Sequence, residues 1–172
     1  LNAGASCDIE VQYSPVGASA GDNDTIDFAY NDGVNPQNVT RDVTGIALTA
    51  ASITMNLADP YNFGTVAQGG ESAVVITLTN GGASTATAIT ETTLGGNFVF
   101  TGGSNTFPGT NGDCTATLGG GATCDIEVAF TPGTTGALVG TVTIQYNNGA
   151  TTVNTTKDLQ GNGANPAVLQ IS

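Results

Sequence analysis

Residues 121–132 read GATCDIEVAFTP and residues 4–15 read GASCDIEVQYSP, so the chain carries nearly the same twelve residues twice. In the copy at 121–132, apolar residues alternate with mostly polar ones. One face carries Cys124, Ile126, Val128 and Phe130, and the other carries Asp125, Glu127, Ala129 and Thr131. Alternation with period two is typical of a β-strand with one buried and one solvated face. We therefore expect a strand here, with the carboxylates of Asp125 and Glu127 in open solvent.

The same alternation recurs along the chain. It is present in GTVTIQYNNG from Gly140, which ends in an Asn-Gly turn, and in SAVVITLTNGG from Ser72. Asn-Gly pairs supply the positive φ angles of tight hairpins, and no window shows convincing helical periodicity. Short strands separated by turn signals roughly every 8–12 residues predict an all-β fold, an antiparallel β-sandwich.

The repetition extends well beyond the opening motif. TIDFAYNDG from Thr25 matches TVTIQYNNG from Thr141, and TRDVTG from Thr40 matches TKDLQG from Thr156, both 116 residues apart. Self-similarity at a fixed spacing indicates a tandem array of like domains. We assign three segments: residues 1–49 as the C-terminal part of one sandwich repeat, residues 50–163 as a complete repeat, and residues 164–172 as the first strand of a following repeat or a donor strand.

The charge balance narrows the classes of partner. The 172 residues include two basic and fourteen acidic side chains, for a net charge of −12, and no histidine. Nucleic acids and anionic membranes are recognised by clustered Lys and Arg, so neither is expected as a partner. Without histidine there is no imidazole base for a Ser or Cys nucleophile. No apolar run is long enough to span a bilayer. We expect no enzymatic activity, no membrane insertion and no small-molecule ligand.

The cysteines indicate an oxidising compartment. Cys114 precedes Cys124 by ten residues across a glycine turn, and two short strands joined by that turn would bring the sulfurs within bonding distance. Two buried free thiols are the alternative; zinc is disfavoured because two cysteines without histidine do not complete its ligand shell. Cys7 is unpaired, and the position equivalent to its partner falls just upstream of Leu1. A disulfide predicts a secreted or cell-surface protein.

The order of these pieces resembles a known family. YNFGTVAQGGESAVVITLTNGG from Tyr61, GGNFVF from Gly95, the cysteine-flanked stretch and TKDLQGNG from Thr156 follow one another. Together they resemble the ASPM–SPD-2–Hydin (ASH)-like repeats, especially the bacterial secreted choice-of-anchor D domains. The resemblance implies an immunoglobulin-like sandwich related to the PapD and major sperm protein group. It also implies a structural or binding module without catalytic residues, strung into long extracellular proteins.

An acidic stretch, GDNDTIDFAYNDG from Gly21, is the candidate metal site. Carboxylates are the ligands that Ca²⁺ prefers. The candidate ligands are Asp22, Asp24, Asp27 and Asp32. The spacing does not match the EF-hand loop, and solvated surface acids are the alternative. Apart from calcium at this stretch, no cofactor is expected.

Three functions follow as hypotheses. The first is a non-catalytic structural repeat of an extracellular stalk, fibre or matrix protein, whose partners are neighbouring repeats or copies of itself. The second is a self-assembling filament subunit, because the partial repeat leaves apolar side chains for another strand to cover. In that case the donor strand would carry Ala167, Val168, Leu169 and Ile171. The third is an adhesin module that binds calcium or carbohydrate.

Overall fold

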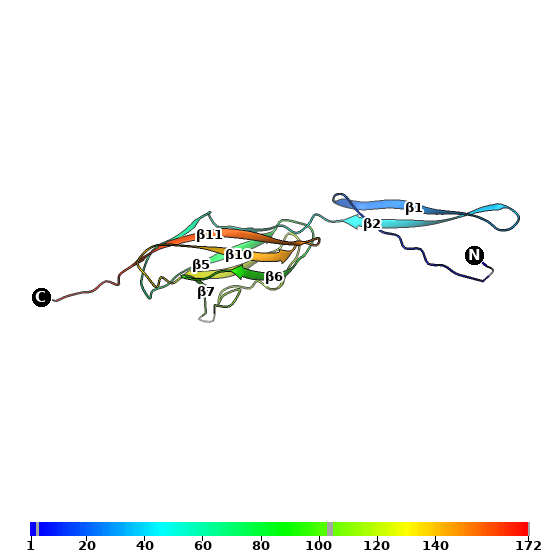
Figure 1. The fold of residues 1–172 in the computed structure, drawn as a ribbon. Helices are drawn as coiled ribbons and strands as arrows, with labels where there is room; N and C mark the ends of the chain where they lie inside the picture. The colour runs from blue at the N-terminus through cyan, green and yellow to red at the C-terminus, as the bar shows by residue number, and fades with distance from the viewer. Residues whose placement is uncertain (3, 103–104, 172) are drawn as a thin grey trace. The chain divides into compact units, whose positions relative to one another are not determined.

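The computed structural model of the chain describes residues 1–2, 4–102 and 105–171. The chain divides into two compact units, residues 1–49 and residues 50–172, and each is described by itself. All the secondary structure in the described residues is strand or turn (Figure 1). None of the described segments is a helix that could cross a membrane.

The second unit is a sandwich of two sheets (Figure 1). One sheet has the order β3-β5-β9-β7, and its strands are Ile53–Met55, Ser72–Asn80, Thr123–Phe130 and Phe98–Phe100. The other has the order β4-β11-β10-β6-β8, and its strands are Tyr61–Ala67, Thr152–Ala164, Gly136–Asn147, Ala86–Thr93 and Thr117–Leu118. The described pairs in this unit are antiparallel except β4 with β11, which run parallel.

Aromatic rings fill the centre of this sandwich. Phe98 stacks on Phe130 with ring centroids 5.1 Å apart, and Phe63 lies 5.7 and 5.8 Å from the two. Phe130 also lies directly over the backbone of Gly161 on β11, where an added Cβ would come within 2.5 Å of the ring. A side chain at position 161 would therefore push the two sheets apart, which explains glycine inside this strand.

β9 confirms the predicted strand but corrects its outer face. Cys124, Ile126, Val128 and Phe130 are buried as expected. The prediction that Glu127 points into open solvent is wrong, because Glu127 is only 8% exposed and Ala129 is fully buried. Residues 105–112 fold over this side of the strand and cover Glu127.

The turn between the cysteines also differs from the prediction. β8 does not form a hairpin with β9; it pairs with β6 in the opposite sheet through Ala86–Leu118 and Thr87–Thr117. The chain therefore changes sheets between Cys114 and Cys124. Next to the disulfide, the backbone N–H groups of Asp113 and Cys114 donate to the carbonyl oxygen of Asp125 on β9.

The first unit contains one hairpin, formed by β1 (Ser19–Asn31) and β2 (Pro36–Ala47). Its copy of the opening motif, residues 7–14, forms no strand. In the second unit the equivalent strand, β9, bonds to β5 and β7. The described part of residues 1–49 has no further strand that could take those two positions, so this motif copy lacks the neighbours that a strand needs.

The last residues form no strand either. Residues 165–171 follow β11, and the apolar side chains Val168, Leu169 and Ile171 are almost fully exposed. By the 116-residue spacing, Leu169 and Ile171 correspond to Ile53 and Met55 of β3, which are buried and pair with β5. In the described structure this segment belongs to neither sheet of the second unit.

Candidate functional site

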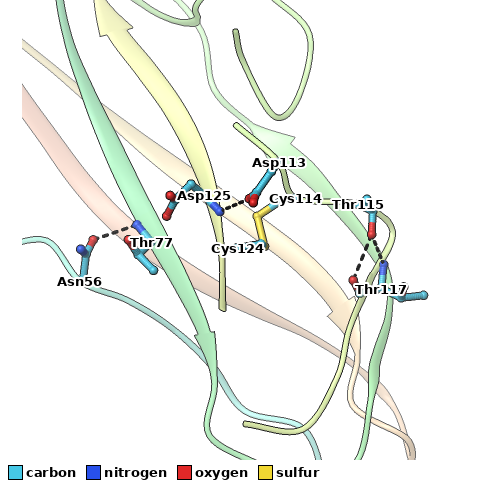
Figure 2. Close-up of a disulfide and its surroundings, with 8 residues drawn as sticks. All are labelled: Asn56, Thr77, Asp113, Cys114, Thr115, Thr117, Cys124 and Asp125. Atoms are coloured by element: carbon cyan, nitrogen blue, oxygen red, sulfur yellow. Dashed lines mark hydrogen bonds between the residues drawn. A yellow bond between two sulfur atoms is a disulfide. The ribbon is translucent and has the colours of Figure 1, made fainter. Parts of the chain in front are cut away.

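The predicted pair of cysteines is joined. Cys114 and Cys124 form a disulfide with their Cα atoms 4.9 Å apart (Figure 2). Beside it, the backbone N–H of Asp125 donates to the Asp113 carboxylate at 2.7 Å. Asp113 and the two sulfurs are close enough to resemble a metal-ligand cluster. The sulfurs are bonded to each other and are not available as thiolates, so the arrangement is a covalent link between β9 and the segment leading to β8.

A carboxylate fastens the covering segment to β9. Glu127 accepts hydrogen bonds from the Thr101 hydroxyl, from the Asn111 backbone N–H at 3.2 Å and from the Asn111 side-chain amide at 2.8 Å. The Thr101 hydroxyl in turn accepts from the Thr110 backbone N–H. The Thr101 hydroxyl and the Asn111 amide hold the pKa of Glu127 below its usual range. The hydrogen-bond donors to Glu127 come from Thr101 and Asn111, and these bonds hold residues 105–112 over the outer face of β9.

A second buried polar residue joins strand ends from both sheets. Asn80, at the end of β5, is fully buried. Its side-chain oxygen accepts from the N–H groups of Ser52 and Gly82, and its amide donates to the carbonyls of Ser84, Leu118 and Gly119. This one side chain thereby holds together the segment entering β3, the β5–β6 turn and the end of β8.

The acidic residues of the first unit do not converge. Asp22 and Asp24 lie on one face of β1, and Asp27 lies on the opposite face. Asp32 is in the turn at the far end of the strand, ten residues or about 30 Å from Asp22 at the usual strand rise. The structure therefore does not bring the four predicted calcium ligands to one point.

Two of these carboxylates bind groups of the chain itself. Asp22 accepts from the Tyr13 hydroxyl at 2.5 Å and from the Ser19 hydroxyl at 2.7 Å. These bonds lower the pKa of Asp22, and the same contact raises the pKa of Tyr13. Asp32 accepts from the N–H groups of Asn35 and Val34 and from the Gln37 amide, which lowers its pKa. Both residues stabilise local structure.

The hairpins of the two units share several hydrogen bonds at equivalent positions. Thr25 donates to Asp42 at 2.8 Å in the first, as Thr141 donates to Asp158 at 2.9 Å in the second. At the turns, Asn31 accepts from the Gly33 N–H, as Asn147 accepts from the Gly149 N–H, both at 2.8 Å. Each bond has its counterpart 116 residues further along the sequence.

An aromatic contact is duplicated as well. Tyr13 lies over Gly45, where an added Cβ would come within 2.8 Å of the ring, as Phe130 lies over Gly161. Tyr13 and Phe130 hold the same place in the two copies of the opening motif. The contact recurs even though residues 7–14 form no strand. Beside it is a shallow hollow whose lining includes Val11, Asp22 and Val43.

What differs between the hairpins is burial. Ile144 and Tyr146 on β10 are 0% and 5% exposed. Their counterparts on β1, Phe28 and Tyr30, are 38% and 55% exposed. The other exposed apolar side chains of the first unit include Ile9, Val11 and Val39. We call the apolar side of residues 1–49 the open face, defined by Ile9, Val11, Tyr13, Phe28, Tyr30 and Val39.

Comparison with known proteins identifies the fold family. The family model for the HYDIN/CFA65/VesB-like, Ig-like domain matches residues 54–162, which is more than half of the chain. The chain belongs to this family. The resemblance to the ASH-like group predicted from the sequence is thereby confirmed. Comparison with curated protein sequences finds no match.

The solved structures that match this chain come from different settings. The ASH/PapD-like domain 7 of human CEP192 is 13% identical, with a TM-score of 0.51, and the match covers 69% of this chain and 89% of that domain. The VesB protease of Vibrio cholerae is 19% identical, with a TM-score of 0.50 over 66% of this chain and 32% of VesB. The secreted serine protease VesC from Vibrio cholerae is 17% identical over 67% of this chain and 23% of VesC, with a TM-score of 0.42. The chain thus spans 32% of the length of VesB and 23% of the length of VesC.

The burial of Glu127 and of Asn80 was not predicted from the sequence. Glu127 stands in an alternating strand, where its position indicates a solvated face, and nothing local shows that residues 105–112 return to cover it. Asn80 precedes two glycines, which predicts a turn but not full burial. Both depend on contacts made between segments far apart along the chain.

Proposed function

We propose that the chain is a repeated, non-catalytic structural module of an extracellular protein, in which successive immunoglobulin-like sandwiches set the spacing of the parts they connect. The observation that supports this best is the duplicated bonding of the two hairpins. The Thr–Asp bond and the Asn-capped turn recur 116 residues apart, and the aromatic ring over glycine recurs with the ring 117 and the glycine 116 residues further on. Such recurrence is expected when one supersecondary unit is used repeatedly in an array.

The polar groups of the second unit support a role without catalysis. Glu127, Asn80 and Asp113 are engaged in hydrogen bonds that hold loops and strand ends in place. A catalytic carboxylate or nucleophile needs a free lone pair directed toward a substrate position. These residues instead use their hydrogen-bonding groups within the fold.

The disulfide supports an oxidising location. Disulfides such as Cys114–Cys124 persist in secreted and surface-exposed proteins and are rare in a reducing cytosol. The strongly acidic composition favours solubility and repulsion between copies at the surface. We propose a secreted or cell-surface stalk, fibre or matrix element.

The register of β3 argues against simple polymerisation by strand exchange. A donor strand formed by residues 165–171 would correspond to β3, which hydrogen-bonds to β5. The described part of residues 1–49 corresponds to the end of the domain and has no β5 equivalent. A donated tail would therefore lack its bonding partner on the open face, and serial repeats are the better-supported arrangement.

Limited proteolysis of the protein purified from its source tests the repeat. Protease should cut at exposed junctions such as Leu48–Ala50 and spare the sandwiches. A tandem array then gives a ladder of products spaced by about 11 kDa, the mass of a 116-residue repeat at this composition. A single resistant product near the mass of residues 50–164, with no ladder during partial digestion, would contradict the proposal.

A further inference from the structure

We propose that residues 1–49 are one half of an interface, which closes on a β-sheet segment of the same type as residues 50–118, and that Cys7 then forms a disulfide with a cysteine equivalent to Cys114. This rests on the repeat proposed above and names the partner of the open face. The second unit shows the interface directly, because there both halves are present.

The first argument is the burial of equivalent side chains. In the second unit, Ile144 and Tyr146 are covered by the sheet β3-β5-β9-β7 and its connections. Phe28 and Tyr30 occupy the same hairpin positions with the same backbone bonding, yet remain substantially exposed. Apolar side chains arranged on one sheet face gain free energy when a second sheet covers them. The open face therefore corresponds to the side of β10–β11 that packs against the sheet β3-β5-β9-β7 in the second unit.

The second argument is the free edge of β2. Its counterpart β11 bonds in parallel to β4, with Leu159 opposite Tyr61 and Ala164 opposite Ala67. The equivalent residues are 43–48, the end of β2 and the residue after it, and the described strands of the first unit leave that edge unpaired. A partner with a β4-like strand can bond there in parallel, which fixes both the direction and the register of docking.

The third argument is the position of Cys7. It corresponds to Cys124, whose sulfur is bonded to Cys114, and it stands in the same motif with its side chain exposed as a free thiol. Tyr13 already lies over Gly45, so this motif copy is held at its distal end where β9 would be. A partner whose β4-like strand binds β2 in the register above brings its cysteine to Cys7, as Cys114 is brought to Cys124.

The bond forms by exchange with a small-molecule disulfide such as oxidised glutathione. The Cys7 thiolate attacks one sulfur of the oxidant, giving a mixed disulfide and releasing one reduced thiol. The thiolate of the partner cysteine then attacks the Cys7 sulfur and releases the second thiol. In total, two protein thiols lose two electrons and two protons, and the oxidant is reduced to two thiols.

The chain's own C-terminal segment does not fit this role. Residues 165–171 supply only the counterpart of β3, which makes no pairing with the counterparts of β1 or β2. They also contain no cysteine. The occupant must bring at least the strands equivalent to β4 and β5, together with the cysteine.

Thiol mapping of the protein purified from its source is the decisive experiment. Free thiols are alkylated at the moment of lysis, and the unreduced protein is digested and analysed by mass spectrometry. The Cys114–Cys124 peptide pair serves as the internal control. We expect Cys7 linked to a protein cysteine; Cys7 recovered as the alkylated thiol, or bonded only to a small thiol, would overturn the proposal. Proteolytic ladders obtained alongside free Cys7 would reject this interface while leaving the repeat intact.

A reconstitution separates specific docking from random thiol collision. The 172-residue chain is mixed with a polypeptide of residues 50–118 in a glutathione redox buffer, and linkage of Cys7 to the probe's Cys114 is followed on non-reducing gels. We expect linkage that falls about tenfold in rate in a Phe28→Asp, Tyr30→Asp variant, the factor that corresponds to losing about 1.4 kcal/mol of docking free energy. The matched control is Val139→Asp, an exposed apolar residue of the second unit.

The reactivity of Cys7 toward a small thiol reagent must be equal in both variants. Linkage that is equally fast in the Phe28→Asp, Tyr30→Asp variant, or in denaturing urea, would show that the open face plays no part. Absence of any linkage to the probe would overturn the claim that a segment of this type is the partner.

Discussion

The hairpins β1–β2 and β10–β11 share several internal hydrogen bonds but differ in their surroundings. Their Thr–Asp pairs, their capped turns and their glycines under an aromatic ring correspond one to one. The apolar side chains of Ile144 and Tyr146 on β10 are buried against a second sheet, whereas their counterparts on β1 are exposed to solvent. Local sequence thus determines the hairpin and its turn, whereas burial depends on strands supplied from elsewhere in the polypeptide.

The largest difference is expected when the ring over the glycine is removed. Phe130→Ala deletes a fully buried ring that contacts Phe98, Phe63 and Gly161, and it should lower the free energy of unfolding by about 3–5 kcal/mol. Tyr13→Ala, its counterpart, should leave the main unfolding transition unchanged. Urea titration followed by circular dichroism measures both, and equal losses would show that the two units unfold as one core.

Removing the disulfide should have the next largest effect. Replacing Cys114 and Cys124 with alanine opens a closed loop of about eleven residues and should lower the free energy of unfolding by about 3 kcal/mol. Cys7→Ala, in the same motif position, should change nothing in the isolated chain. The urea midpoint is the readout. A double variant as stable as the parent would mean that the hydrogen bonds between Asp113 and Asp125 hold the segment before β8 against β9 without the disulfide.

A smaller effect is expected at the buried carboxylate. Glu127→Ala leaves the Thr101 hydroxyl and two donors of Asn111 without their acceptor and should cost about 1–3 kcal/mol. Glu10→Ala, at the equivalent but exposed position, should cost nothing measurable.

The same carboxylate should make stability depend on pH. Because the folded-state pKa of Glu127 is lowered, its contribution is complete above the ordinary glutamate pKa of about 4.3 and is lost as pH falls through the folded value. Urea midpoints measured from neutral to acidic pH should fall less steeply in Glu127→Gln than in the parent. Parallel curves would contradict this assignment.

The smallest expected difference is in the pKa of Tyr13, and it should not affect the free energy of unfolding. Tyr13 donates to Asp22, which raises the pKa of the phenol; Phe130 has no hydroxyl with which to repeat the contact. Asp22→Asn should bring the Tyr13 pKa back toward the ordinary value of about 10, as followed by ultraviolet absorbance during alkaline titration. Ser19→Ala removes the other hydrogen-bond donor to Asp22, and the pKa of Tyr13 should stay raised in this variant. An unchanged Tyr13 pKa in Asp22→Asn would show that the contact with Asp22 does not raise the pKa.

Much of the sandwich follows from local alternation. β5, β9 and β10 lie where period two predicts them, and the Asn-Gly turn closes the β10–β11 hairpin. The predicted disulfide between Cys114 and Cys124 is present. These features depend on residues close in sequence, so the pattern of side chains contains enough information to locate them.

The structure corrects two predictions, the solvated Glu127 and the turn between the cysteines, and both concern contacts between distant segments. The covering of Glu127 by residues 105–112 and the pairing of β8 with β6 involve a stretch rich in Gly, Asn and Thr, which has no periodicity to indicate its path. The candidate calcium ligands were grouped because they are close in sequence. An extended strand separates such residues, so Asp22 and Asp32 lie at opposite ends of β1.

The parallel pairing of β4 with β11 also determines how the second unit responds to tension. The chain enters this sheet at Tyr61 and leaves it at Ala164, and the two strands lie side by side in the same direction. A pull on the ends of the unit drags β4 backward and β11 forward, so their shared hydrogen bonds are strained in shear, all at once. An antiparallel pair pulled from neighbouring ends would instead unzip one bond at a time. The parallel direction of β4 and β11 therefore predicts resistance to stretching along the chain.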